Sequence, residues 1–486
     1  MASFVHNIRE YRHYRWLAAF VLGMAAIVSV GDFGAVSVAM PTISDNFGAN
    51  LSSVQWIAIG NMVAVSAFLM PMGRLSDLVG RKKIYISGLT LFVVGAGLAA
   101  MAPTLSILIG LRVIQGLGMA MTQGNQMAIM ASVFPPQNRG TAIGVHVTCV
   151  GLGLVIGPSL GGILVELLGW RSIFYIHLPL AVLYLIPCLL VLDEGKISKS
   201  LGGVGEGRFD LLGTVLSAAA LVLFLFGMTN PLGLESQLRI SLLVLSGLLL
   251  LGFVAWERVC VNPILDVALF KKPSFSFNVT GRVILFISYA PVIFFMPFYL
   301  QGVAGYSPGA TGVIMMTNAL GMIIAGPLAG RLSDRFGTKT FNVVGSLVAA
   351  SGVFVLSNIT TDSSLPFLLA GVMLPSWGMG IFSAPNTSSI LKAAPRSSYG
   401  ATAGFLQLLR NGSTVTGIAI GTLVVAGAIS AAGLHANLRG FSEGVDVNTA
   451  EAFVAGLRIL FLSVAVLQVT GAVISFVSRT ETDPTD

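Results

Sequence analysis

The sequence contains one charged phrase twice, and each copy lies between two long apolar runs. The first copy, GRLSDLVGRKK, spans residues 73–83, and the second, GRLSDRFGTKT, spans residues 330–340. A phrase that recurs together with its apolar surroundings indicates a duplicated chain with one copy in each half. The shared GRLSD is predicted to be a short charged turn between two membrane helices.

The apolar runs are about 20 residues long, which is the length that a bilayer requires. Hydrophobic residues make up 55% of the 486 residues and charged residues only 10%, against roughly 25% charged residues in soluble globular proteins. So few charges cannot cover a surface in water, and soluble chains of this length divide into several domains. The sequence therefore predicts an integral membrane protein embedded in the lipid bilayer, whose first apolar run is too long for a signal-peptide core.

The apolar runs divide the chain into spans. We predict an all-α protein with 14 transmembrane helices, at residues 15–41, 53–73, 83–102, 105–131, 141–166, 172–192, 209–229, 239–257, 274–302, 309–330, 341–358, 366–390, 400–431 and 452–478. Because the repeated phrase follows spans 2 and 10, the chain is predicted to hold two pseudo-symmetric six-helix bundles. These bundles occupy residues 1–192 and 274–486, the latter with a cytoplasmic tail, and a connector at 193–273 carries two accessory transmembrane helices.

Lys and Arg are concentrated in the loops of one side of the predicted membrane. The positive-inside rule places that side, and with it both termini, in the cytoplasm, as an even number of spans requires. The net charge of +7 reflects this bias, so we predict no nucleic-acid partner.

The repeated phrase is a candidate cytoplasmic gate. Its glycines allow a tight turn, and Asp77 can cap a helix N-terminus or pair with Arg81. A basic loop that only sets topology does not need the repeat, so we favour a conformational latch. The residues of this gate are Gly73, Arg74, Asp77, Gly80, Arg81, Gly330, Arg331 and Asp334.

The loop resembles the signature between spans 2 and 3 of the major facilitator superfamily, and further motifs resemble its fourteen-span drug:proton antiporter family. These motifs are DFGAVSVAMP at 32–41, RVIQGLGMA at 112–120, GLGLVIGPSLGG at 151–162 and WRSIFYI at 170–176. The resemblance covers nearly the whole chain. It implies a multidrug efflux transporter of a bacterial inner membrane, which is a secondary active transporter and not an enzyme.

Three polar residues inside the spans are candidates for proton coupling. A carboxylate within a span, such as Asp32, is costly unless it is paired, hydrated or protonated, which makes it a candidate proton carrier; the alternative is a hydrogen-bonded structural Asp. Arg112 stays charged and can act on a neighbouring acid or on water, or can instead bind backbone carbonyls. Gln115 lies on the same helix face, and the resemblance implies a role for Arg112 in proton coupling.

Span 5 carries a strip of small residues that lets membrane helices approach closely, and Pro158 bends the helix. The resemblance implies a hinge and gate between the two halves. The residues of this motif are Gly153, Gly157, Pro158, Gly161 and Gly162.

Other polar residues are candidates to line a substrate cavity: Asn61, Gln123, Asn125, Gln126, Tyr299, Gln301 and Arg410. Several depart from the family pattern, which favours a more hydrogen-bonding substrate than an apolar cation. His146 and His177 are candidates for a proton relay because His is the residue type that changes charge near neutral pH. A lone membrane His is more often a packing residue, although His177 replaces an Asn that is common in the family. Arg282 is interpreted as reaching towards the cytoplasmic surface.

We therefore predict a proton-coupled antiporter that exports a small organic molecule by alternating access and works as a monomer. No nucleotide-binding loop, nucleophile–base pair or metal-ligand cluster stands out, so we expect the proton gradient as energy source, with no cofactor, metal or catalytic residue. The first alternative is a dedicated metabolite exporter or an uncoupled carrier of the same fold. The second alternative is a membrane sensor that does not transport.

Overall fold

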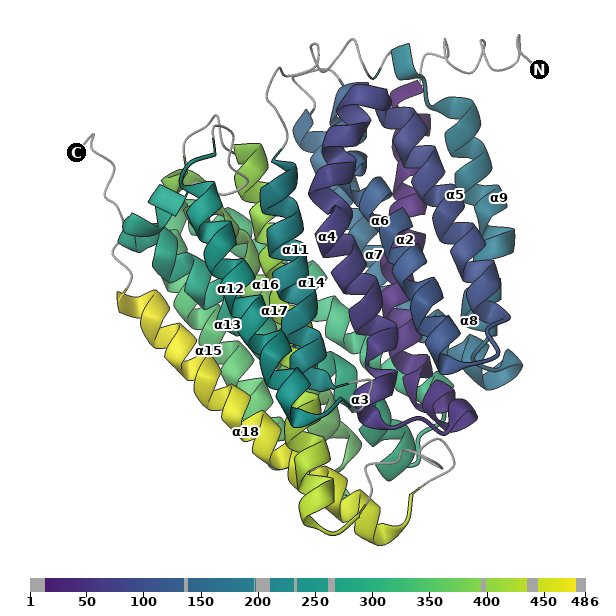
Figure 1. Ribbon diagram of the computed structural model, residues 1–486, viewed down its shortest axis with the longest axis vertical. Helices are drawn as coiled ribbons and strands as arrows, with labels where there is room; N and C mark the ends of the chain where they lie inside the picture. The colour runs from purple at the N-terminus through teal and green to yellow at the C-terminus, as the bar shows by residue number, and fades with distance from the viewer. Residues whose placement is uncertain are drawn as a thin grey trace. The chain divides into compact units, whose positions relative to one another are not determined.

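The chain folds into long helices (Figure 1). The computed structural model describes residues 14–134, 139–195, 197, 210–230, 234–260, 267–394, 399–434 and 445–477. Within these residues there is no β-strand, and 14 helices are long and apolar enough to cross a membrane. The prediction of an all-α, multi-pass membrane fold is confirmed.

The helices follow the predicted spans within a few residues. The first half contains α2 (Tyr14–Phe47), α3 (Leu51–Val54), α4 (Trp56–Val79), α5 (Arg81–Ala100), α6 (Leu105–Val133), α7 (Arg139–Leu168), α8 (Ser172–Tyr175) and α9 (His177–Val191). The two accessory helices are α11 (Leu211–Thr229) and α12 (Ser236–Glu257). The second half contains η2 (Val267–Lys271), α13 (Pro273–Phe298), η3 (Tyr299–Val303), α14 (Pro308–Phe336), α15 (Thr338–Leu356), α16 (Leu365–Ala393), α17 (Tyr399–Ala431) and α18 (Val447–Val477).

The described residues group into two compact units. The first unit comprises those within Met1–Ala39 and Trp56–Thr214, and the second those within Met40–Gln55 and Val215–Asp486. The end of α2 and the short helix α3 therefore belong with the second unit, where the Thr422 hydroxyl donates a hydrogen bond to Gln55 Oε1 at 2.8 Å.

The repeated GRLSD phrase is helical, and its prediction as a turn between spans is wrong. Helix α4 continues through the first copy to Val79, and α14 continues through the second to Phe336. Only Gly80 and Gly337 leave the helical conformation, with φ of 117° and 83°. A single residue with positive φ is enough to reverse the chain, and glycine adopts that conformation without a Cβ penalty.

Two further boundaries differ from the prediction. Span 1 is predicted to end at Pro41, but α2 continues to Phe47 with Pro41 inside it. A proline removes one backbone hydrogen bond, and a membrane helix tolerates that loss. The predicted span 172–192 is divided at Ile176 into α8 and α9. This division makes His177 the first residue of α9.

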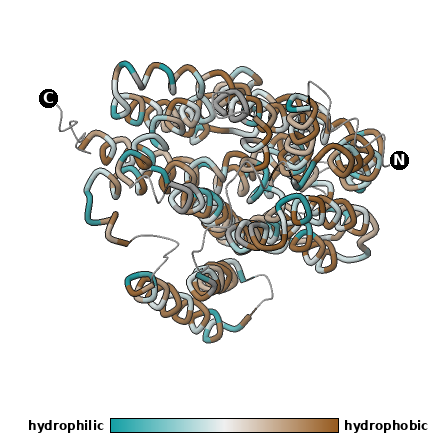
Figure 2. Tube along the Cα trace, turned by 90° about the horizontal axis from the view of Figure 1, so that it is seen from above, coloured by the Kyte–Doolittle hydropathy of each residue, from teal (hydrophilic) through white to brown (hydrophobic). Residues whose placement is uncertain are grey.

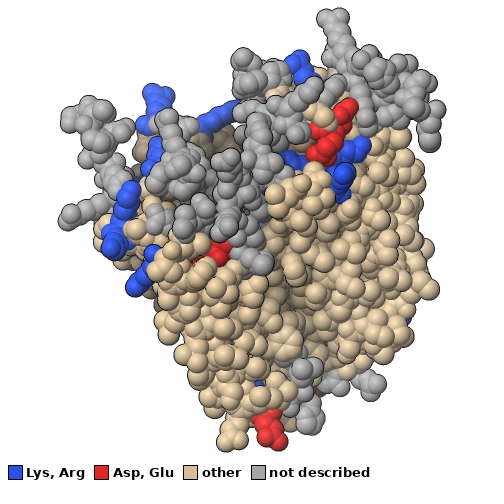
Figure 3. Space-filling view, turned by 45° about the horizontal axis from the view of Figure 1, so that its top comes forward, with Lys and Arg blue, Asp and Glu red and all other residues tan. Residues whose placement is uncertain are grey.

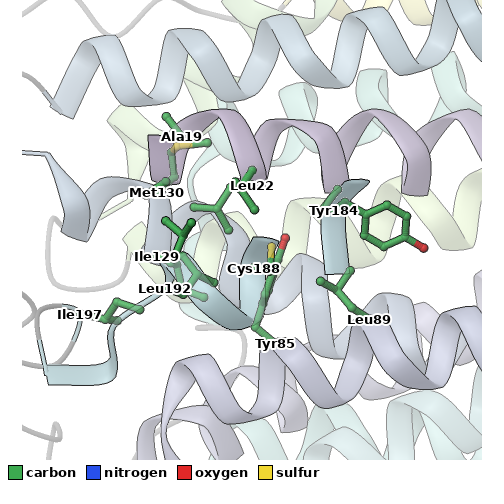
Figure 4. Packing of buried hydrophobic residues seen from close by; sticks show 14 of the residues in the cluster. Ala19, Leu22, Tyr85, Leu89, Ile129, Met130, Tyr184, Cys188, Leu192 and Ile197 are labelled. Carbon is green, nitrogen blue, oxygen red and sulfur yellow. The ribbon is translucent and has the colours of Figure 1, made fainter. Parts of the chain in front are cut away.

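Apolar side chains fill the interior of each unit and also cover the flanks of the helices. In the first unit, residues of α2, α5, α6 and α9 pack into one buried cluster that includes Leu22, Tyr85 and Cys188 (Figure 4). Hydrophobic residues dominate the helices in Figure 2, and large apolar side chains such as Phe20 and Leu251 are exposed. Lys and Arg gather at the upper end of the view in Figure 3, and the flank below is almost free of charge. An apolar flank below a basic end is the surface expected of a protein in a bilayer.

Candidate functional site

Asp32 lies near the middle of α2 and is buried, with 3% of its surface exposed. Its Oδ2 accepts a hydrogen bond from Nη1 of Arg112 at 2.7 Å. Its Oδ1 lies 3.1 Å from Nε2 of His177. One buried carboxylate therefore contacts two side chains that can carry positive charge.

Arg112 is fully buried on α6 and donates hydrogen bonds to three different groups. Besides Asp32, Nη1 donates to Oε1 of Gln115 at 2.9 Å, and Nε donates to the Ile57 carbonyl of α4 at 3.2 Å. The guanidinium carbon also lies 5.8 Å from the centre of the Phe174 ring. Arg112 thus binds an acid and a backbone carbonyl together, which combines the two alternatives considered from the sequence.

Two hydrogen-bond donors at this site have no partner among the described residues. They are Nη2 of Arg112 and Nε2 of Gln115, and both atoms are buried. Buried donors of this kind are normally satisfied by a partner or by ordered water. The described residues of the site therefore leave two buried donors unsatisfied.

His177 belongs to this site, although the sequence favoured a packing role for it. It is 3% exposed, and its ring packs edge-on against Phe92 with centroids 4.9 Å apart. Its position as first residue of α9, directly after the break at Ile176, places it beside Asp32. The one sequence signal was that His177 stands where the family commonly has Asn, since a titratable replacement of an amide near a buried acid points to charge.

The polar residues around span 4 bind the backbone of neighbouring turns and helices. Asn61 donates to the Arg112 carbonyl at 3.1 Å, and Gln126 donates to the Leu22 carbonyl at 2.7 Å. Asn125 donates to the Met121 carbonyl one turn earlier in α6. The structure brings Asn61 to the backbone of the site, whereas Gln126 links α6 to α2 and Gln123 is half-buried.

The glycine strip of α7 packs directly on α2. A Cβ atom on Gly157 would lie 2.3 Å from the Gly31 carbonyl oxygen, and one on Gly161 would lie 2.4 Å from Cα of Ala35. Gly153 faces Ile27 in the same way, while Pro158 contacts Gly34 and Gly162 is buried. The strip therefore sets the position of the helix that carries Asp32.

The two copies of the candidate gate share one local structure. In each, the Ser of GRLSD donates to the carbonyl three residues earlier, at 2.5 Å in the first copy and 2.8 Å in the second. Each helix then ends at its glycine, Gly80 or Gly337. Of the remaining gate candidates, Arg331 is exposed, and the side chains of Arg74, Asp77 and Asp334 lie outside the described residues.

Glu194 provides the first gate with a cap that was not anticipated. Its carboxylate accepts hydrogen bonds from the backbone N–H groups of Arg81 and Lys82 at 2.9 and 2.8 Å, at the start of α5. Lys82 Nζ in turn donates to the Leu189 and Leu192 carbonyls. A carboxylate at a helix N-terminus is favourable because the first N–H groups lack partners there. Gly80, which has no side chain, holds the N-cap position of α5, and the prediction that Asp77 caps a helix or pairs with Arg81 concerns a side chain outside the described residues.

The candidates of the second half do not form one cluster with each other. Tyr299 and Gln301 are buried in the π-helical turn η3, and the Tyr299 hydroxyl donates to the Thr360 carbonyl at 2.5 Å. Arg410 lies on α17 and is exposed. On α13, Arg282 is buried and donates to the Thr387 hydroxyl at 3.1 Å, so the expectation that it reaches towards the surface is wrong.

The described part of the chain contains 14 apolar helices and, within the first unit, a buried ionic site, which together define a multi-pass membrane protein of the transporter class. A family model described as Major Facilitator Superfamily matches residues 22–267 and 278–485. The chain belongs to the major facilitator superfamily, and the resemblance found from its motifs is confirmed.

Relatives with curated names are transporters. The chain is 31% identical over 408 residues to the riboflavin transporter RibZ of Clostridioides difficile, which covers 83% of this chain and 87% of RibZ. It is 28% identical over 414 residues to the multidrug resistance protein Stp of Mycobacterium tuberculosis, covering 84% and 76% of the two chains. A bacterial homologue of the human lysosomal transporter Spinster has the same fold, with a TM-score of 0.69, 15% identity and coverage of 96% and 97%. The protein is therefore a transporter of small molecules and not an enzyme.

Proposed function

We propose that the protein is a proton-coupled antiporter that exports small organic molecules by alternating access. The observation that carries this proposal is the buried Asp32, whose two oxygens contact Arg112 and His177. Ionisable residues inside membrane spans are rare and commonly belong to proton or substrate pathways. Asp32 is the group that gains and loses the proton.

In the ionised state, Asp32 neutralises Arg112 and fixes the orientation of its guanidinium. The two unused donors, on Arg112 and Gln115, are then held in place for an acceptor of the exported molecule. Preorganised donors bind better because their ordering is already complete. The ionised site is the state that binds the substrate.

Protonation of Asp32 removes the charge that holds Arg112. The strong, charge-assisted bond becomes a weaker one, so Arg112 and Gln115 lose their fixed geometry and the affinity for substrate falls. By linkage, a bound substrate lowers the affinity for the proton to the same degree. Alternate occupation by proton and substrate is the condition for antiport.

The test is proton movement in sealed proteoliposomes that contain the full chain. A pH gradient is imposed, and internal pH is followed while riboflavin or the lipophilic cation ethidium is added. Wild type, Asp32→Asn and the control Asp45→Asn, a carboxylate later in α2, are compared. We expect substrate-triggered proton movement in wild type and in the control, and none in Asp32→Asn.

Each other result changes the proposal in a defined way. Proton movement that survives in Asp32→Asn keeps antiport but removes Asp32 from the proton pathway. Substrate flux without proton movement in any variant would replace the antiporter with an uncoupled carrier.

A dedicated metabolite carrier is the second candidate, and the similarity to the riboflavin transporter RibZ favours it. The hydrogen-bonding donors of the site also suit a polar molecule better than an apolar cation. Riboflavin flux without ethidium flux in the same vesicles would support this candidate, and flux of both would support a multidrug exporter.

We also propose the topology, the membrane, the oligomeric state and the energy source of the protein. Both termini lie in the cytoplasm, the membrane is the bacterial inner membrane, and a monomer works on the proton gradient without a cofactor. The gathering of Lys and Arg at one end supports this orientation.

A further inference from the structure

In the second half of the chain, two spans each contain an arginine and no acid that could pair with it. Arg282 lies on α13 and Arg410 on α17. Helices α13, α15, α16 and α17 contain no Asp or Glu at all, and those of α14 and α18 lie near helix ends, at Asp334 and Glu451. Cations at such positions are normally paired or lie on a substrate pathway.

The guanidinium of Arg282 is fixed by neighbouring side chains, and one of its N–H donors has no partner among the described residues. It is 8% exposed, its Nη1 donates to Thr387 at 3.1 Å, and its guanidinium carbon lies 5.3 Å from the centre of the Phe286 ring. Its Nε is buried and has no hydrogen-bond partner in the described part of the chain. A fixed guanidinium with a free donor is prepared for an external acceptor.

Arg410 lies on the face of α17 that packs against α13. Cβ atoms on Gly417 and Gly421 would meet the Ile287 carbonyl at 2.4 Å and the Phe295 ring at 2.6 Å. Residues seven and eleven positions apart share one helix face, so Arg410 points to the same side. It is nevertheless exposed, and it forms no ion pair with a described residue.

The two arginines lie at nearly the same depth. Both glycine contacts advance in the same direction along α13 and α17, so the helices run parallel. Arg282 precedes Ile287 by five residues and Arg410 precedes Gly417 by seven, which at the helical rise per residue is a difference of about 3 Å. Arg410 is close enough to Arg282 for their charges to repel.

We propose that Arg282 and Arg410 form a binding site for an anionic group, a carboxylate or a phosphate. The two neighbouring positive charges repel each other, and a bound anion reduces this repulsion. The guanidinium fork also matches the oxygens of a carboxylate or a phosphate. The anionic group belongs to the exported molecule, and this part rests on the proposed function. The same chemistry occurs in an anionic phospholipid head group, which the experiment separates.

The experiment measures dye binding to the full chain in nanodiscs, by fluorescence anisotropy at one pH and without a gradient. Fluorescein offers a free carboxylate and net negative charge, and rhodamine 123 offers a similar ring system as an esterified cation. We expect Arg282→Gln and Arg410→Gln each to weaken fluorescein binding by about tenfold or more, without weakening rhodamine 123 binding. Arg282→Lys and Arg410→Lys keep the charge but lose the guanidinium fork, so their fluorescein affinity is expected to lie between wild type and the Gln variants.

The matched control is Arg458→Gln, which removes an exposed arginine from α18. Unchanged fluorescein affinity in both Gln variants, or wild type that binds fluorescein no better than rhodamine 123, would overturn the proposal. Nanodiscs of phosphatidylcholine are compared with nanodiscs that contain phosphatidylglycerol. Competition by phosphatidylglycerol that disappears in Arg282→Gln would assign the site to lipid and overturn its assignment to the exported molecule.

No proton movement is measured in this experiment. Fluorescein binding that neither Gln variant weakens would contradict the anion site and leave the role of Asp32 untouched. Failure of the proteoliposome test would contradict proton coupling and leave the anion site untouched.

Discussion

Arg112 is the residue on which the buried site of the first unit depends. It donates to Asp32, to Gln115 and to the Ile57 carbonyl, and so connects α2, α4 and α6. A buried ion pair contributes little net stability when intact, but the removal of one partner leaves an uncompensated charge. The stability of the first unit is therefore sensitive to single substitutions at this pair.

We predict that Arg112→Gln lowers stability by about 3–5 kcal/mol, because Asp32 is left buried without its main counter-charge. The thermal unfolding midpoint in detergent measures this loss. The double variant Asp32→Asn/Arg112→Gln is expected to recover a large part of it, since no unpaired charge remains. A double variant as unstable as the sum of the two single variants would contradict the coupling of these side chains.

His177 gives Asp32 a second side-chain partner beside Arg112. We predict that His177→Asn still transports, because the Asn amide can donate to Asp32 in place of the ring, whereas His177→Leu removes that hydrogen bond and transports more slowly. Substrate flux in vesicles is measured for both variants. The control is His146→Leu, which replaces a half-buried His on α7, and equal flux for wild type and His177→Leu would refute the role of His177.

At the scale of elements, close packing of α7 on α2 positions the acid. Gly157 permits this approach because its neighbour across the interface is the backbone of Gly31, which cannot move aside as a flexible side chain can. The contacts at Gly153 and Gly161 repeat the pattern one turn earlier and one turn later. The strip is a packing device, as its small residues indicate.

We predict that Gly157→Ala destabilises the protein by about 1–3 kcal/mol, because the added Cβ overpacks the interface, and that it reduces transport. Gly144→Ala on the same helix is the control, since a Cβ there would meet nothing within 4 Å. Thermal unfolding and substrate flux are measured for both. Equal behaviour of the two variants would show that the strip does not constrain α2.

At the scale of the whole molecule, the distribution of charge predicts the orientation in the membrane. We expect green fluorescent protein fused to the C-terminus to fluoresce and alkaline phosphatase fused there to be inactive, because the proposed topology places both termini in the cytoplasm. Alkaline phosphatase fused after Asp362, in the loop between α15 and α16, should be active. The reverse pattern of fusion activities would show that the proposed topology is inverted.

Much of the fold was predictable because each span is an independent apolar run of bilayer length. The predicted spans and the observed helices agree within a few residues, except where local geometry decided. At Pro41 and in the two GRLSD phrases, the helix continued through residues that suggested an end. At Pro41, burial in a membrane removes water as the alternative hydrogen-bond partner, so the backbone stays helical. In each GRLSD phrase no further glycine or proline follows the first glycine until Gly80 or Gly337, where positive φ ends the helix.

The sequence by itself determined the membrane class, the count of spans and the family, because length, hydropathy and short motifs are local properties. It also singled out Asp32, Arg112 and Gln115, since ionisable groups inside apolar runs are conspicuous. The tertiary structure decided which of these side chains meet. His177 reaches Asp32 across 145 residues of sequence, and Glu194 reaches the start of α5 across more than a hundred. Such contacts depend on helix packing, which brings distant residues together at distances that no local pattern records.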